Sequence, residues 1–105
     1  MKFINLTPHD VNIYTDNGIK TIKPSGLARC TQQQTLIGCI GNINLYKTEF
    51  GEVNGLPAPC ADTLYIVSMA VAEAVKEQRS DVLIPIEPVR DENGTIIGCR
   101  GLARL

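Results

Sequence analysis

The sequence predicts a small α+β domain, built mainly from antiparallel β-hairpins with one central helix. Two observations predict this class. Short runs of β-branched and aromatic residues recur along the chain, and turn residues such as Asn-Gly separate several of them. One stretch, residues 63–102, places a helical pattern between two apolar runs, which indicates a possible parallel strand–helix–strand unit. The chain has 105 residues, a length typical of a single domain, residues 1–105.

The strand–helix–strand stretch begins with residues 63–67, which are apolar without polar alternation. Such a run predicts a strand that is buried on both faces. Ser68 follows, and its hydroxyl can cap a helix of about residues 69–78, whose valines recur every four residues. Residues 82–86 predict a second buried strand, in which Pro85 indicates an edge or a bulge.

A hairpin is predicted after this unit, because Asp91-Glu92-Asn93-Gly94 leads into an apolar run at residues 95–100. Two registers are open. A two-residue loop at Asn93-Gly94 places Glu87 opposite Arg100, whereas a bulged loop places Glu87 opposite Cys99.

The N-terminal half predicts a strand at residues 2–6, a polar turn at residues 7–10 and two further hairpins. The first hairpin turns at Asn17-Gly18 and would place Ile13 opposite Ile22. The second turns at Gly41-Asn42, between strands at residues 35–40 and 43–47.

Residues 49–62 contain several glycines and prolines, which predicts a long irregular loop. We expect this loop to lie near the start of the helix. Long loops in small domains are often binding segments.

Composition limits the partners that the protein can have. Ten basic and eleven acidic residues are interspersed, giving a net charge of −1, so a nucleic-acid polymer is not expected. No apolar run reaches the ~20 residues that span a bilayer, and no signal-peptide pattern is present, so we expect no membrane and a location in the host-cell cytoplasm. A domain this small favours a homo-oligomer.

The four cysteines are too widely spaced for a zinc or redox motif, so reduced thiols, no metal and no cofactor are expected. These residues are Cys30, Cys39, Cys60 and Cys99.

Three features are candidates for binding an anion. Arg90 and Arg100 follow apolar residues near one hairpin, and guanidinium groups bind phosphates well. The alternative is that they pair with nearby acidic residues. Ser68 would place helix-start amides toward an anion, or would serve as an N-cap only. Phe50, in the predicted loop, is the best candidate to stack on a base.

His9 and Cys99 are the candidates for chemistry. His9 is the only histidine and could act as a general base, or bond the backbone of its turn. Cys99 lies beside Arg100, which could activate its thiol, but neighbours along a strand point to opposite faces. The alternative for Cys99 is a buried structural thiol.

Several strings resemble a family of small proteins carried by bacteria, phages and prophages. They are Asn5-Leu6-Thr7-Pro8-His9, Phe50-Gly51-Glu52-Val53 with Gly55-Leu56-Pro57, Tyr65-Ile66-Val67-Ser68, and Val89-Arg90-Asp91-Glu92 through Gly94 to Ile97-Gly98-Cys99-Arg100. The resemblance covers nearly the whole chain and implies a phage setting. By analogy of size and setting, the chain is similar to anti-defence sponges such as the Thoeris anti-defence proteins, which sequester cyclic ADP-ribose derivatives.

We therefore expect a phage-type binding protein that sequesters a nucleotide-derived immune signal without turnover and so inhibits bacterial defence. The ligand would be a small anion, a cyclic nucleotide or a cyclic ADP-ribose-like molecule. The expected ligand-binding residues are His9, Phe50, Ser68, Arg90 and Arg100. One alternative is a small enzyme acting on a nucleotide or related phosphoryl compound through His9 or Cys99. Another is a structural or interaction subunit.

Overall fold

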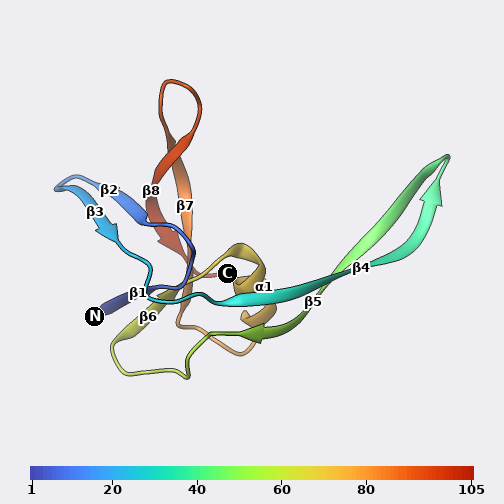
Figure 1. Cartoon of the computed structure of the whole chain (residues 1–105), viewed down its shortest axis with the longest axis horizontal. Coiled ribbons are helices and arrows are strands. Elements are labelled where there is room, and N and C mark those ends of the chain that lie inside the picture. Colours follow the sequence, from blue (N-terminus) through green and yellow to red (C-terminus); the bar gives the residue numbers. More distant parts are fainter.

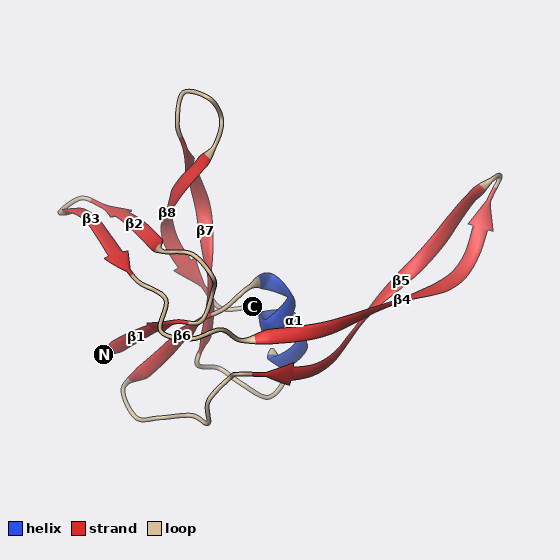
Figure 2. Ribbon diagram, in the orientation of Figure 1, coloured by secondary structure: helices blue, strands red, loops and turns tan.

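A curled six-stranded sheet forms the body of the protein, and a long β-hairpin projects from it (Figures 1 and 2). The structure is a computed structural model and describes residues 1–105. Strands take up 57% of the residues, and the single helix, α1 (Met69–Val75), has seven. The small domain, its hairpins and its one helix are confirmed. The protein is nevertheless mostly β, and the expected α+β class overstated the helical share.

The sheet is mixed, with strand order β1-β6-β7-β8-β2-β3. β1 pairs with β6, β6 with β7 and β8 with β2 in parallel, while β7–β8 and β2–β3 are antiparallel hairpins. The parallel β6–α1–β7 unit that the sequence predicted is confirmed. The strands are β1 (Lys2–Asn5), β2 (Val11–Thr15), β3 (Gly18–Ile22), β6 (Thr63–Ile66), β7 (Val82–Arg90) and β8 (Ile96–Ala103).

The curl closes where the two outer strands, β1 and β3, meet. Asn5 at the end of β1 forms a parallel bridge with Pro24, which follows β3. The amide of Ser25 donates to the carbonyl of Asn5 at 2.9 Å, and the Asn5 side chain donates to the carbonyl of Ile22 at 2.9 Å. The sheet therefore has no free edge at this end.

Two groups of apolar side chains form the core. One fills the curl with residues from five of the six strands: Phe3, Val11, Ile13, Ile22, Ile66, Cys99 and Leu102. The other lies around α1 and includes Leu6, Ala28, Tyr65, Val67, Val71, Ala72, Val82 and Ile84. The helix thus covers one part of the sheet with its buried residues, Val71 and Ala72.

Helix α1 begins after Ser68, whose hydroxyl accepts a hydrogen bond from the amide of Val71 at 3.4 Å. The helix ends three residues before the predicted limit of residue 78. The amide of Gln78 bonds the carbonyl of Val75 at 2.9 Å, an i to i+3 pattern, so the chain tightens into a turn there.

The β2–β3 register differs from the prediction. Val11, not Ile13, lies opposite Ile22, and Thr15 pairs with Gly18, so the turn residues are Asp16 and Asn17. Neither turn residue has a positive φ, and Gly18 has a φ of 114°. The glycine therefore supplies the left-handed position after the turn instead of standing within it.

In the β7–β8 hairpin, Ile86 pairs with Gly101 and Pro88 with Cys99, which places Glu87 opposite Arg100. This is the first of the two registers that the sequence left open. The turn itself is longer than two residues, because the amide of Asp91 bonds the carbonyl of Thr95 at 2.9 Å and the strands shift between Val89 and Arg90. Pro85 lies beyond the stretch of β7 that pairs with β6, so β6 does not need its missing N–H.

The projecting hairpin consists of β4 (Arg29–Ile40) and β5 (Ile43–Asn54), joined at Gly41-Asn42 as predicted. It is much longer than the sequence indicated, and the prediction of an irregular loop from residue 49 is wrong. Gly51 in β5 leaves room for the Thr31 side chain, which a Cβ at this position would meet. The remaining loop, residues 55–62, lies near the end of α1 and not its start: the guanidinium of Arg79 donates to the carbonyl of Pro57 at 2.9 Å.

Candidate functional site

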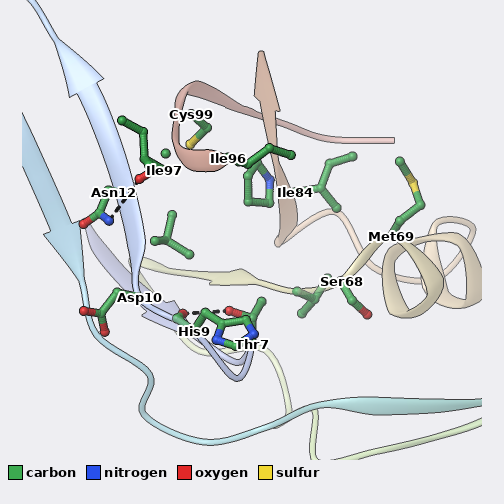
Figure 3. Close-up of a pocket in the computed structure, with 14 residues that line it drawn as sticks. Thr7, His9, Asp10, Asn12, Ser68, Met69, Ile84, Ile96, Ile97 and Cys99 are labelled. Carbon is green, nitrogen blue, oxygen red and sulfur yellow. Dashed lines mark hydrogen bonds between the residues drawn. The ribbon is translucent and has the colours of Figure 1, made fainter. Parts of the chain in front are cut away.

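A cleft of about 850 Å³ opens between the turn after β1, the start of α1 and the strands β2, β7 and β8 (Figure 3). This volume suits a drug-sized or nucleoside-sized ligand. Its apolar lining residues are Val11, Val67, Met69, Ile84, Pro85, Ile96 and Ile97. The polar side chains are those of Thr7, His9, Asp10, Asn12 and Ser68. Thr7 and His9 lie on one side of the cleft, with Ile96 and Ile97 across from them in Figure 3.

Asn5 holds the polar side of the cleft in place. Its buried side chain accepts hydrogen bonds from the amide of Thr7 at 2.9 Å and from the Thr7 hydroxyl at 2.6 Å. Its amide nitrogen donates to the carbonyl of His9 at 2.7 Å. The backbone of residues 7–9 is thus fixed by a buried group, which presents Thr7 and His9 in a preorganised turn.

The opposite wall depends on the close approach of β8 to β2. A Cβ at Gly98 would lie 2.5 Å from Cε1 of Tyr14 and 2.7 Å from the carbonyl oxygen of Asn12, so only glycine fits there. The side chain of Asn12 donates to the carbonyl of Ile97 at 3.3 Å and accepts from the hydroxyl of Thr21 at 2.7 Å. These contacts position Ile97 beside the cleft.

The charge of the lining is acidic. No lysine or arginine lines the cleft, while the carboxylate of Asp10 does. A phosphate placed inside would meet no lysine or arginine and would be repelled by the carboxylate of Asp10. The uncharged, apolar part of a ligand is therefore what the cleft accommodates best.

Cys99 also lines the cleft, with 3% of its surface exposed. Burial raises the pKa of the Cys99 thiol, which a backbone hydrogen bond at Gly101 only partly offsets. A thiol that stays protonated at neutral pH is a poor nucleophile. This favours the structural alternative for Cys99.

The structure brings together two of the five predicted ligand-binding residues, His9 and Ser68. In the turn it is the carbonyl of His9 that accepts hydrogen bonds, from Asn5 and from Thr7. Ser68 caps α1, as one of its two alternatives held. Because α1 has only seven residues, we assign no anion site to its start.

Arg90, Arg100 and Phe50 lie outside the cleft. Arg90 donates to the carbonyl of Gly94 at 2.8 Å and so braces the β7–β8 turn. Arg100 is exposed on β8. Phe50 lies in β5, on the projecting hairpin, opposite Gln32.

Met69, Ile96 and Ile97 are lining residues that the sequence did not single out. The one indication was the exposed pair Ile96-Ile97 itself. Strand alternation predicts that these neighbours face opposite ways, whereas both line the cleft, because the pairing of β7 with β8 shifts there and leaves Ile97 as an extra residue. That these two isoleucines face a cleft could not be predicted without knowing that β8 lies beside β2.

Compared with protein-family models, with curated proteins and with solved structures, the chain shows no significant match. The resemblance to a phage and bacterial family therefore stays a prediction.

Two further findings concern a membrane-spanning helix and a group of metal ligands. The helix is too short to cross a membrane, and no group of three or more His, Cys, Asp or Glu side chains is arranged to hold a metal ion.

Proposed function

We propose that the protein binds a small molecule in this cleft and holds it without turnover. The observation that carries the proposal is the cleft itself, about 850 Å³, with an apolar wall and a polar turn that the buried side chain of Asn5 fixes. Tight binding benefits from such a preorganised site because little conformational freedom is lost when the ligand enters. Because burial raises the pKa of the Cys99 thiol, this residue is not an activated nucleophile, which favours binding without turnover.

The ligand class is a nucleotide-derived molecule that is recognised through its base and sugar. The apolar wall of Ile96 and Ile97 suits the flat face of a base, and Thr7, Asp10 and Asn12 offer groups for its polar edge. The phosphates would remain in solvent at the mouth, since the lining contains no lysine or arginine. Arg90 and Arg100 have no part in this proposal.

The biological role that follows is sequestration of an immune signal by a phage or prophage protein in the host cytoplasm. Cyclic nucleotides and cyclic ADP-ribose isomers are the candidates. Support for this role comes from the sequence resemblance and from the analogy with anti-defence sponges.

A second candidate function, a subunit of an assembly, is favoured by the projecting hairpin. Its apolar side chains are exposed along both strands, including Leu36, Ile37, Ile40, Ile43 and Tyr46. Exposed apolar surface on a soluble chain marks sites of protein–protein contact.

The two functions differ in what the protein retains. The purified protein is mixed with cyclic dinucleotides, cyclic trinucleotides, cyclic ADP-ribose isomers and the matching nucleosides. Free ligand is then removed by filtration, and the protein is denatured by heat. Recovery of one intact compound in a stoichiometric amount supports sequestration. A product that grows with time contradicts binding without turnover, and retention of nothing from the panel favours the assembly subunit.

A further inference from the structure

The hairpin of β4 and β5, which we call the arm (residues 29–54), leaves the body without a partner for most of its length (Figure 1). An isolated two-stranded hairpin is at best marginally stable in water, and both of its outer edges are free to pair. The arm therefore needs a covering surface.

The arm makes the surface of the chain unusually large. The accessible surface is 7218 Å², whereas a compact monomer of 11.4 kDa has roughly 5,800 Å². The radius of gyration is 16.3 Å, against about 13 Å for a compact domain of this length. The excess of roughly 1,400 Å² is comparable to what one subunit buries in a large, stable homodimer.

The outer half of the arm is apolar on one of its faces. By strand alternation and the observed pairing, Ile40, Ile43 and Leu45 share a face near the tip. Ile40 and Ile43, paired on either side of the turn, are each 69% exposed. No part of the same chain covers them.

The same face is complementary to itself in charge. Lys47 and Glu49 follow Leu45 on it, by the same alternation along β5. In a two-fold pair the same face of each subunit meets the other, so a lysine of one copy can approach a glutamate of its partner. The net charge of −1 adds little repulsion between copies.

We infer that the arm is the interface through which two copies of this chain form a two-fold dimer, with the apolar tip faces packed together. The area of the arm and its self-complementary charge both match a second copy. The pairing is irregular in both strands, with an extra residue in β4 at Ile37 and one in β5 at Gly51-Glu52, opposite Thr31. Both edges of the arm are therefore disturbed, so the faces of the arms pack in preference to their edges.

The test uses light scattering behind gel filtration on the full chain, over a range of concentrations. The wild type should have twice the chain mass of 11.4 kDa, and its melting temperature should rise with protein concentration. Ile43→Lys should raise the dimer dissociation constant by roughly a hundredfold, because each dimer would bury two unpaired charges. Its far-UV circular dichroism should still show a folded β-protein, since Ile43 is exposed in one chain and belongs to neither core of the body.

The matched control is Ile19→Lys, on β3 of the body, where Ile19 is 57% exposed. This variant should stay dimeric. A wild type of single-chain mass, with a melting temperature independent of concentration, would overturn the inference. So would a dimer that Ile43→Lys leaves intact.

Discussion

The side-chain amide of Asn5 donates a 2.9 Å hydrogen bond to the carbonyl of Ile22, joining the two outer strands of the curled sheet. The same amide nitrogen also bonds the carbonyl of His9 at 2.7 Å. Closure of the sheet and the shape of the cleft therefore depend on one fully buried polar side chain. A buried group that satisfies several backbone atoms is expensive to replace.

Asn5→Ala should lower the free energy of unfolding by about 3 kcal/mol, because it leaves the carbonyl of Ile22 and the amide of Thr7 without their side-chain partner. Urea denaturation measures the change. Asn93→Ala, in the exposed β7–β8 turn, is the control and should stay within about 0.5 kcal/mol of the wild type. Equal effects of the two substitutions would show that Asn5 does not hold the sheet closed.

Two glycines on β8 provide a matched pair. Gly98→Ala should destabilise the protein by about 1–3 kcal/mol, since the new Cβ would lie 2.7 Å from the backbone oxygen of Asn12. At Gly101 the nearest atom to a new Cβ is a side-chain carbon of Ile86 at 3.7 Å, an ordinary contact. Gly101→Ala should therefore be nearly neutral by thermal unfolding. Neutral behaviour of Gly98→Ala would mean that β8 does not lie this close to β2.

The ion pair between Asp81 and Arg79 should make the stability of the protein depend on pH in the acid range. The carboxylate accepts two hydrogen bonds of 2.8 Å from the guanidinium, which lower the pKa of Asp81. Because the pKa of Asp81 is lower in the folded state than in the unfolded state, its ionised form stabilises the protein. The whole of this stabilisation is present at any pH above the ordinary carboxyl pKa. This contribution is lost as the pH falls below about 4.

Asp81→Asn should therefore cost about 1–2 kcal/mol at neutral pH, and the difference from the wild type should shrink toward about pH 2. Melting curves across this range measure it. Glu73→Gln, which removes an exposed pair with Lys76 at 3.1 Å, should change stability by less than about 0.5 kcal/mol. A deficit of Asp81→Asn that is constant with pH would contradict the role of the ion pair.

Thiol labelling tests the environment of Cys99. Cys39 and Cys60 are exposed, whereas Cys99 is buried and its pKa is raised by that burial. In the native protein, iodoacetamide should modify Cys39 and Cys60 at least about tenfold faster than Cys99, as mass spectrometry of peptides would report. Rapid modification of Cys99 would indicate an accessible thiolate and would favour the enzyme alternative.

Local patterns predicted much of the fold. The parallel unit around α1 followed from two apolar runs with Ser68 between them, and the turn at Gly41-Asn42 followed from its residues. These features depend on neighbours in the sequence. Closure of the sheet through Asn5 depends on Ile22 and on residues after β3, so nothing local indicated it.

The candidate site was harder to predict than the fold. Arg90 and Arg100 were expected to act together because they are near each other on one hairpin. The structure shows Arg90 bonded within its own turn, and Arg100 exposed away from the cleft lining. Ile97 reaches the cleft only because β8 also pairs with β2, a contact between residues 86 positions apart at Ile13 and Cys99.

The most direct test of the cleft compares two isoleucines of similar exposure in the β7–β8 hairpin. Ile97 lines the cleft and is 39% exposed, whereas Ile86 is 37% exposed and lies outside it. The measurement is the amount of intact nucleotide-derived compound retained after filtration by Ile97→Asn, by Ile86→Asn and by the wild type. Stoichiometric retention by the wild type and by Ile86→Asn, with at least about a tenfold loss in Ile97→Asn, is the predicted result. Equal retention by both variants, or none by the wild type, would contradict binding in the cleft.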